Sequence, residues 1–136
     1  MMTVSLEIKN LARQLLDFEK GTDKTPANAG AVMRVFGKLR IKLTRFAGLV
    51  GFSALLSRAL VLAKADAPSL GDVQAREDGT LVGLAETGQN AGPEAVGLAR
   101  VILVAQFLEL LVEFIGEPLT LTLVREVWPD ASMDKI

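Results

Sequence analysis

The sequence contains no cysteine, no histidine and no tyrosine among its 136 residues. Without cysteine the chain can form no disulfide bond and no thiolate zinc site, and it has no cysteine nucleophile. Without histidine it lacks the side chain that most often transfers protons near neutral pH and most often binds metals. These absences predict a protein that is not an enzyme and that holds no metal or cofactor.

Motifs for phosphate binding and for serine catalysis are also missing. No Gly-x-x-x-x-Gly-Lys-Ser/Thr or Gly-x-Gly-x-x-Gly pattern occurs, and the serines have no histidine to act as a base. The segment from Met1 to Phe18 carries charged residues throughout, so we predict no secretory signal there. Together with the missing cysteines, this favours a cytoplasmic protein.

Apolar residues, in contrast, make up 50% of the chain, and charged residues make up 23%. This composition excludes a disordered chain, and the length suits one domain rather than two. We therefore expect a single helical domain over residues 1–129, followed by a frayed tail at residues 130–136.

Two segments are apolar enough to need a membrane check, because the mean hydropathy of the chain is high at +0.36. Phe46–Ala63 contains Arg58, and Ala95–Ile115 contains Arg100 and two glutamates. A charge at the centre of a spanning helix costs roughly 2.5–3.5 kcal/mol on insertion scales. We therefore predict that both segments are buried helices of a soluble protein.

Charge is distributed unevenly along the chain, although the formal net charge is only −1. Residues 1–24 carry four basic and four acidic side chains, and residues 25–64 carry seven basic and no acidic ones. Residues 65–136 carry four basic and twelve acidic side chains. Such asymmetry indicates either a basic surface for an anionic partner or attraction between the two halves, within one chain or between chains.

Apolar residues at helical spacing predict three helices in the first half of the chain. The apolar stripe of the first is Val4, Ile8, Leu11, Leu15 and Phe18, and that of the second is Val32, Phe36, Leu39, Leu43 and Phe46. Thr25-Pro26 is typical of a helix start and opens the second helix. A bend at Gly48 and Gly51 is expected to separate it from a third helix, Phe52–Lys64.

A β-hairpin is predicted between the third and fourth helices. Val73–Glu77 and Thr80–Leu84 flank Asp78-Gly79, a dipeptide that suits a two-residue type I′ turn because glycine tolerates positive φ. With that turn one face of the hairpin is apolar, and we expect it to pack on the helices. Its members would be Val73, Ala75, Val82 and Leu84.

The last two predicted helices complete a mainly α fold. A helix from Pro93-Glu94 to Ile115 is apolar around most of its circumference, so we place it at the centre. Residues 119–124 alternate like a strand, but Pro118 suits the first turn of a helix, so we favour a helix that ends at Trp128. The expected architecture is a small helical domain of about five helices, with one β-hairpin excursion between helices three and four.

Four basic residues of the second helix form a stripe, which we call the basic stripe: Arg34, Lys38, Lys42 and Arg45. Their spacings place them on one helix face, opposite the apolar stripe. A basic face can bind the phosphates of nucleic acid or of lipid head groups. We favour a solvated face, or one that pairs with the acidic half of the chain. Ile41 interrupts the stripe, which indicates that something covers this face.

Three further residues are candidates for a special role. Glu109 and Glu113 lie four residues apart on the most apolar helix, and paired carboxylates can bind metals or act as acid and base. Helical metal sites of this kind also use histidine, so we expect instead a buried acidic seam that is hydrated or paired with the basic stripe. Trp128, the only tryptophan, is expected to anchor the core or an interface.

These features predict a non-enzymatic protein–protein interaction or regulatory module that self-associates, most simply as a homodimer. A small domain as apolar as this one exposes an apolar patch unless a partner covers it. The alternative is an anion-binding protein that uses the basic stripe to bind nucleic acid or an anionic membrane surface.

Overall fold

The computed structural model of this chain describes residues 6–20, 29–67, 70, 73–76, 81–83 and 93–129. Its elements are α1 (Leu6–Lys20), α2 (Ala29–Asp66), β1 (Gln74–Ala75), β2 (Leu81–Val82), α3 (Pro93–Ile115) and α4 (Glu117–Val127). Because α2 is bent into two arms, the described residues form five helical segments and one two-stranded antiparallel hairpin. The predicted mainly α fold, with a hairpin between the third and fourth helices, is confirmed. The predicted helix start at Thr25-Pro26, the turn at Asp78-Gly79 and the tail lie outside the described residues.

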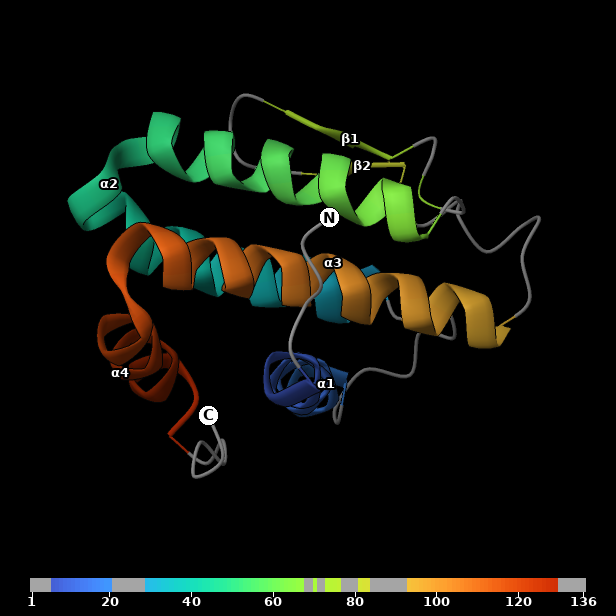
Figure 1. Cartoon of the computed structure of the whole chain (residues 1–136), viewed down its shortest axis with the longest axis horizontal. Coiled ribbons are helices and arrows are strands. Elements are labelled where there is room, and N and C mark those ends of the chain that lie inside the picture. Colours follow the sequence, from blue (N-terminus) through green and yellow to red (C-terminus); the bar gives the residue numbers. More distant parts are fainter. Residues whose placement is uncertain are drawn as a thin grey trace.

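A sharp bend at Gly48 divides α2 into a first arm (residues 29–47) and a second arm (residues 49–66). Gly48 has φ 74° and ψ 166°, which is not a helical conformation and which favours glycine. Figure 1 shows the two arms running back alongside each other from this bend. The predicted bend is thus confirmed at Gly48, whereas Gly51 lies within the helix of the second arm.

Alanine substitutions of two glycines in α2, one at the bend and one in the first arm, are expected to change the free energy of unfolding in opposite directions. An added methyl group would meet no atom within 4 Å at either Gly48 or Gly37, so the backbone alone decides the effect. Gly48→Ala should lower the free energy of unfolding by about 1–3 kcal/mol, because its backbone region is almost exclusive to glycine. Gly37→Ala, in the interior of the first arm, should raise it by about 0.5–1 kcal/mol. Urea unfolding of the two variants checks this, and a shift in the same direction for both would contradict it.

Helix α3 lies at the centre of the molecule, as predicted. It contacts α1, α2 and α4, and all residues from 102 to 108 are buried. The Phe107 ring packs against Phe36 of the first arm and Phe52 of the second, at centroid distances of 5.2 and 5.4 Å. In Figure 1, α1 and α4 run across α3 on one side, while the second arm and the hairpin lie on the other. Phe107 therefore connects both arms of α2 to the central helix.

The hairpin pairs in a different register from the one predicted. Ala75 lies opposite Leu81 and Gln74 lies opposite Val82, whereas a two-residue turn at Asp78-Gly79 requires Ala75 opposite Val82. A one-residue slip moves every side chain of a strand to the other face. Leu81 is therefore buried, and Val82 is 37% exposed. The expected apolar face was wrong at Val82, because burying Leu81 removes a larger side chain from water.

A pair of alanine substitutions tests this register. Leu81→Ala should lower the free energy of unfolding by about 2 kcal/mol, because Leu81 belongs to the buried hydrophobic core. Val82→Ala should change it by less than about 0.5 kcal/mol, as for other exposed side chains. Chemical denaturation of the two variants measures both effects. A larger loss of stability at Val82 than at Leu81 would contradict the observed register and favour the one that a two-residue turn requires.

The corner between α3 and α4 is made by a single residue, Gly116. Its φ of 90° favours glycine, and its carbonyl accepts a backbone hydrogen bond from Thr120 at 3.1 Å. The Thr120 hydroxyl donates to the same carbonyl at 2.8 Å, and Pro118 occupies the first turn of α4. Residues 119–124 are helical, as the sequence analysis favoured. The α3–α4 corner is tight because one glycine makes the turn.

The two segments that needed a membrane check differ in burial. Within the described residues, Gly48–Asp66 is the one helical stretch long and apolar enough to cross a membrane by length and composition, with a hydropathy of 1.5. Only 28% of that window is buried inside the molecule. The expected burial is therefore seen for α3 but not for the second arm, which presents an exposed side that includes Val50 and Val61.

Candidate functional site

The basic stripe lies on the first arm, and two of its members hold one carboxylate of α1. The Nε atom of Arg34 lies 3.4 Å from Oε1 of Glu19, and Nη2 donates a hydrogen bond to the Glu19 backbone carbonyl at 2.6 Å. Lys38 donates from Nζ to Oε2 of the same carboxylate. Both cations are therefore engaged inside the molecule, by an acid that lies outside the acidic second half of the chain.

Trp128 completes this cluster from the end of α4. Its Nε1 donates a hydrogen bond to Oε2 of Glu19 at 2.9 Å, and its side chain is buried. Nζ of Lys38 lies 6.0 Å from the centre of the Trp128 ring, at the limit of a cation–π interaction. We call Glu19, Arg34, Lys38 and Trp128 the Glu19 node. It connects α1, α2 and α4, so Trp128 anchors the fold of a single chain.

The Glu19 carboxylate is held in its charged form. Burial by itself would raise the pKa of Glu19, because a charged carboxylate is less stable away from water. The hydrogen bonds from Lys38 and Trp128, together with the charges of Lys38 and Arg34, outweigh burial and hold the pKa below its ordinary value of 4.5. A carboxylate fixed in this way stabilises three helices and is poorly suited to exchange protons near neutral pH.

The lowered pKa of Glu19 gives the node a defined pH dependence. The unfolded chain keeps the ordinary pKa, so the node contributes its full stability above pH about 4.5 and loses it as the pH falls through the lower folded pKa. Trp128 is the only tryptophan, so its fluorescence reports on the node alone. We expect its emission to change in acid and to titrate below the pKa of an ordinary glutamate. Glu19→Gln should remove this titration, and an unchanged titration in that variant would contradict the assignment.

The other two members of the basic stripe lie nearer the bend of α2. Lys42 places Nζ 3.7 Å from Oε1 of Glu126 on α4, so here the stripe does pair with the acidic half of the chain. Arg45 is exposed and forms no ion pair with another described residue. Ile41, which directly precedes Lys42, is 61% exposed, so its side chain is largely uncovered within one chain.

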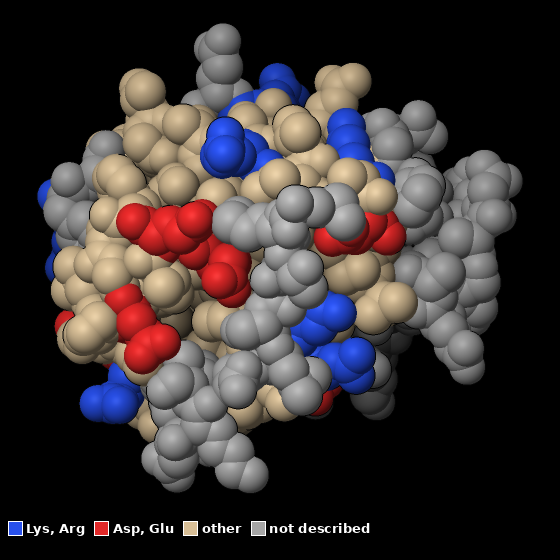
Figure 2. All heavy atoms as spheres, in the orientation of Figure 1, with Lys and Arg blue, Asp and Glu red and all other residues tan. Residues whose placement is uncertain are grey.

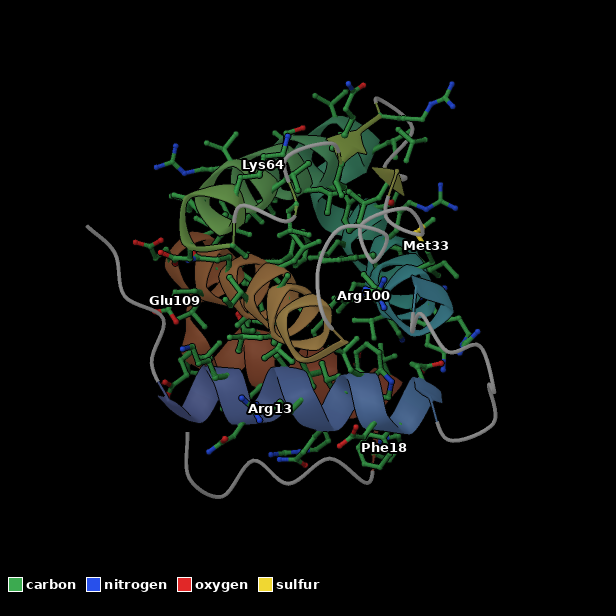
Figure 3. All side chains as sticks on the ribbon, turned by 90° about the vertical axis from the view of Figure 1, so that its right-hand side faces the viewer. Arg13, Phe18, Met33, Lys64, Arg100 and Glu109 are labelled. Atoms are coloured by element: carbon green, nitrogen blue, oxygen red, sulfur yellow. The ribbon has the colours of Figure 1, made fainter. Side chains whose placement is uncertain are left out.

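Sequence reasoning missed Glu19 and assigned Phe18 to the core instead. Phe18 is 42% exposed and points away from α3 in Figure 3, whereas Glu19 is 6% exposed. The two residues follow Leu15 by three and four positions, so either can extend the apolar stripe of the helix. The cations of α2 decide in favour of Glu19. The signal in the sequence was the spacing of Arg34 and Lys38, which lets both reach one carboxylate.

The glutamates of α3 do not form a buried pair. Glu109 is half-buried, whereas Glu113 is exposed. The buried polar residue of this helix is Gln106, which donates from Nε2 to Oδ2 of Asp66 at 3.4 Å. The predicted buried acidic seam is therefore wrong at Glu113, because the last turn of α3 lies at the edge of the bundle. Among the described residues, no group of acidic side chains is placed to hold a metal ion.

Arg100 is the largest fully buried side chain of the chain's described part. Figure 3 shows it between α3 and the first arm, on the side of α3 opposite Glu109. Burial lowers the pKa of its guanidinium, which nevertheless stays charged because arginine titrates far above neutral pH. Its position inside the helix bundle gives it a structural role that the sequence did not indicate.

Four of the ten large apolar side chains that are exposed in the described part of the chain lie at one end of the molecule. The bend of α2, the end of α3 and the start of α4 all lie at the left of Figure 1. The large apolar residues exposed there form what we call the apolar end: Leu49, Val50, Phe114 and Leu119. Val50 is 85% exposed and Phe114 is 59% exposed. Such a concentration of apolar surface on a small domain is typical of an interaction site.

The structure therefore contains two features with different possible roles. The Glu19 node holds helices together, and the apolar end offers apolar surface to a partner. No protein-family model, no curated protein and no solved structure matches this chain.

Proposed function

We propose that this chain is a non-enzymatic interaction module that self-associates as a dimer. The observation that carries the proposal is the apolar end, where Val50 and Phe114 are mostly exposed to water. Fully burying an apolar side chain of this size is worth about 1.5–3 kcal/mol. A second copy of the same surface can bury these side chains without a different partner protein. A two-fold axis lets the same patch of each chain contact the other.

The state of the basic stripe supports an interaction module over an anion-binding protein. Arg34 and Lys38 hold the Glu19 carboxylate, and Lys42 pairs with Glu126. A phosphate bound to this face would have to compete with these acids for the same cations. Arg45 remains the member of the stripe that has no acidic partner among the described residues. One exposed arginine supplies a weak, steeply salt-dependent contact at most.

Light scattering on a dilution series tests the proposal. A dimer, with twice the monomer mass of 14.5 kDa, is expected at micromolar concentrations. A single species of 14.5 kDa throughout the series would contradict self-association.

A parallel binding assay tests the alternative that the basic stripe binds anions. Titration with duplex DNA, and with vesicles that contain phosphatidylserine, should give no binding at physiological salt. Binding that falls steeply as the salt concentration rises would instead favour an anion-binding protein. Arg34→Gln and Lys38→Gln are poor probes here because they also disturb the Glu19 node, so Arg45→Gln is the variant to compare.

A further inference from the structure

The rim of the apolar end carries opposite charges on its two sides. Arg45 lies on the side of the α2 bend, three residues before Gly48. Glu113 and Glu117 lie on the other side, at the end of α3 and the start of α4. Figure 2 shows acidic side chains gathered over this part of the molecule. All three residues are exposed, and none forms an ion pair with another described residue.

This arrangement is self-complementary. When the two-fold axis runs between the two sides of the patch, a residue on one side meets the partner's residues from the opposite side, and the reverse contact is made by symmetry. A patch with a cation on one side and acids on the other therefore pairs unlike charges in both halves of the interface. A patch rimmed by one sign of charge would instead bring like charges together.

We infer that the apolar end is the surface of an isologous dimer between two copies of this chain, with Arg45 of one copy beside Glu113 and Glu117 of the other. This inference rests on the proposed self-association and names the surface that performs it. Val50 and Phe114 form the apolar centre of the interface. The charges at its rim set the register and exclude the arrangement in which like charges meet.

The same rim argues against a lipid surface as the occupant. Cytoplasmic membrane surfaces are negatively charged and attract clusters of lysine and arginine. Glu113 and Glu117 outnumber Arg45 around the apolar end, so an anionic membrane would repel the rim while the apolar centre approached it. A second copy of the chain satisfies both the apolar centre and the mixed rim.

The role of the apolar centre in dimerisation is tested by substituting its exposed residues. Such substitutions leave the buried core of the fold intact. The double variant Val50→Ser with Phe114→Ser should weaken dimerisation by about tenfold or more. The matched control is Val61→Ser, an exposed valine on the second arm away from the bend, which should leave the dimer unchanged. A double variant that dimerises like the wild type would overturn the surface and leave self-association standing. Loss of the dimer in Val61→Ser alone would assign the interface to the second arm instead.

The rim is tested by exchanging its charges. Arg45→Glu should weaken the dimer by about tenfold at low salt, and the pair Glu113→Arg with Glu117→Arg should do the same. All three substitutions together restore unlike pairs across the interface, so the affinity should return to within about threefold of the wild type. A triple variant as weak as the two partial ones would overturn the register.

Vesicle binding distinguishes a lipid surface from a second copy of the chain as the partner of the apolar end. It also separates failure of this inference from failure of the proposed self-association. Phosphatidylcholine vesicles, with and without phosphatidylserine, should not bind the wild-type chain. A wild-type chain that is monomeric and binds vesicles through Val50 and Phe114 would assign the apolar end to lipid. A wild-type chain that is monomeric and binds no vesicles would overturn the proposed function itself.

Discussion

Leu108→Ala and Leu111→Ala should each lower the free energy of unfolding by about 2–5 kcal/mol. Both side chains are fully buried on α3, which is enclosed by α1, by both arms of α2 and by α4. Removal of three carbon atoms from such a site loses the transfer free energy of those atoms and leaves a cavity that close packing cannot fill. Urea unfolding at a fixed protein concentration measures the effect.

Leu98→Ala is the control for these two substitutions, because Leu98 lies on the same helix but is 46% exposed. It should lower the free energy of unfolding by less than about 1 kcal/mol. Leu98 is near the beginning of α3, far along the helix from the apolar end, so the control does not disturb the proposed dimer surface. Losses below about 1 kcal/mol at both Leu108 and Leu111 would place α3 at the surface and contradict the fold.

Glu19→Ala is expected to have the second largest effect, a loss of about 2–4 kcal/mol in the free energy of unfolding. The substitution removes the acceptor of the buried Trp128 Nε1 and the partner of two cations. Arg34 and Lys38 are themselves partly exposed, so water compensates for part of their loss, and the expected effect is smaller than for a fully enclosed ion pair.

Two companion substitutions separate the charge from the hydrogen bonds. Glu19→Gln keeps an acceptor for Trp128 but removes the negative charge, so it should lose less than Glu19→Ala at neutral pH. Glu126→Ala removes the exposed partner of Lys42 and should change stability by no more than about 1 kcal/mol. Equal effects of Glu19→Ala and Glu126→Ala would mean that the node is no more than a surface ion pair.

The helices could be predicted because their signals are local. Apolar spacing, Gly48 at the bend and Pro118 in the first turn of α4 act within a few residues, and no distant contact overrides them. The near-continuous apolar composition of α3 also predicted its central position, since a helix without a polar face has no side to turn toward water.

The features that could not be predicted depend on residues far apart in the sequence. Glu19 replaces Phe18 in the core because Arg34, Lys38 and Trp128 meet it in space, and Trp128 lies 109 positions further along the chain. The hairpin register depends on which side chain of β2 is buried in the core. Neither contact leaves a local periodic signal, so tertiary structure decides between alternatives that the sequence pattern allows equally.

The candidate site was predicted only in part, because some of its features depend on local spacing and others on residues far apart in the sequence. The basic stripe was identified correctly as one helix face, because its spacing is local, and Lys42 pairs with the acidic half of the chain. The apolar end was not identified, because its residues come from the bend of α2 and from the α3–α4 corner, which only the folded chain brings to one end.

Sedimentation equilibrium of the wild-type chain at low and high salt tests whether apolar contacts hold two copies of the chain together. We expect a dimer whose dissociation constant changes by less than about tenfold between about 0.1 and 1 M sodium chloride. Exposed ion pairs contribute about 0–1 kcal/mol each and are screened at the higher salt concentration, while burial of the apolar end is not weakened. A monomer of 14.5 kDa under both conditions would contradict self-association, and a dimer that dissociates completely at high salt would contradict its apolar mechanism.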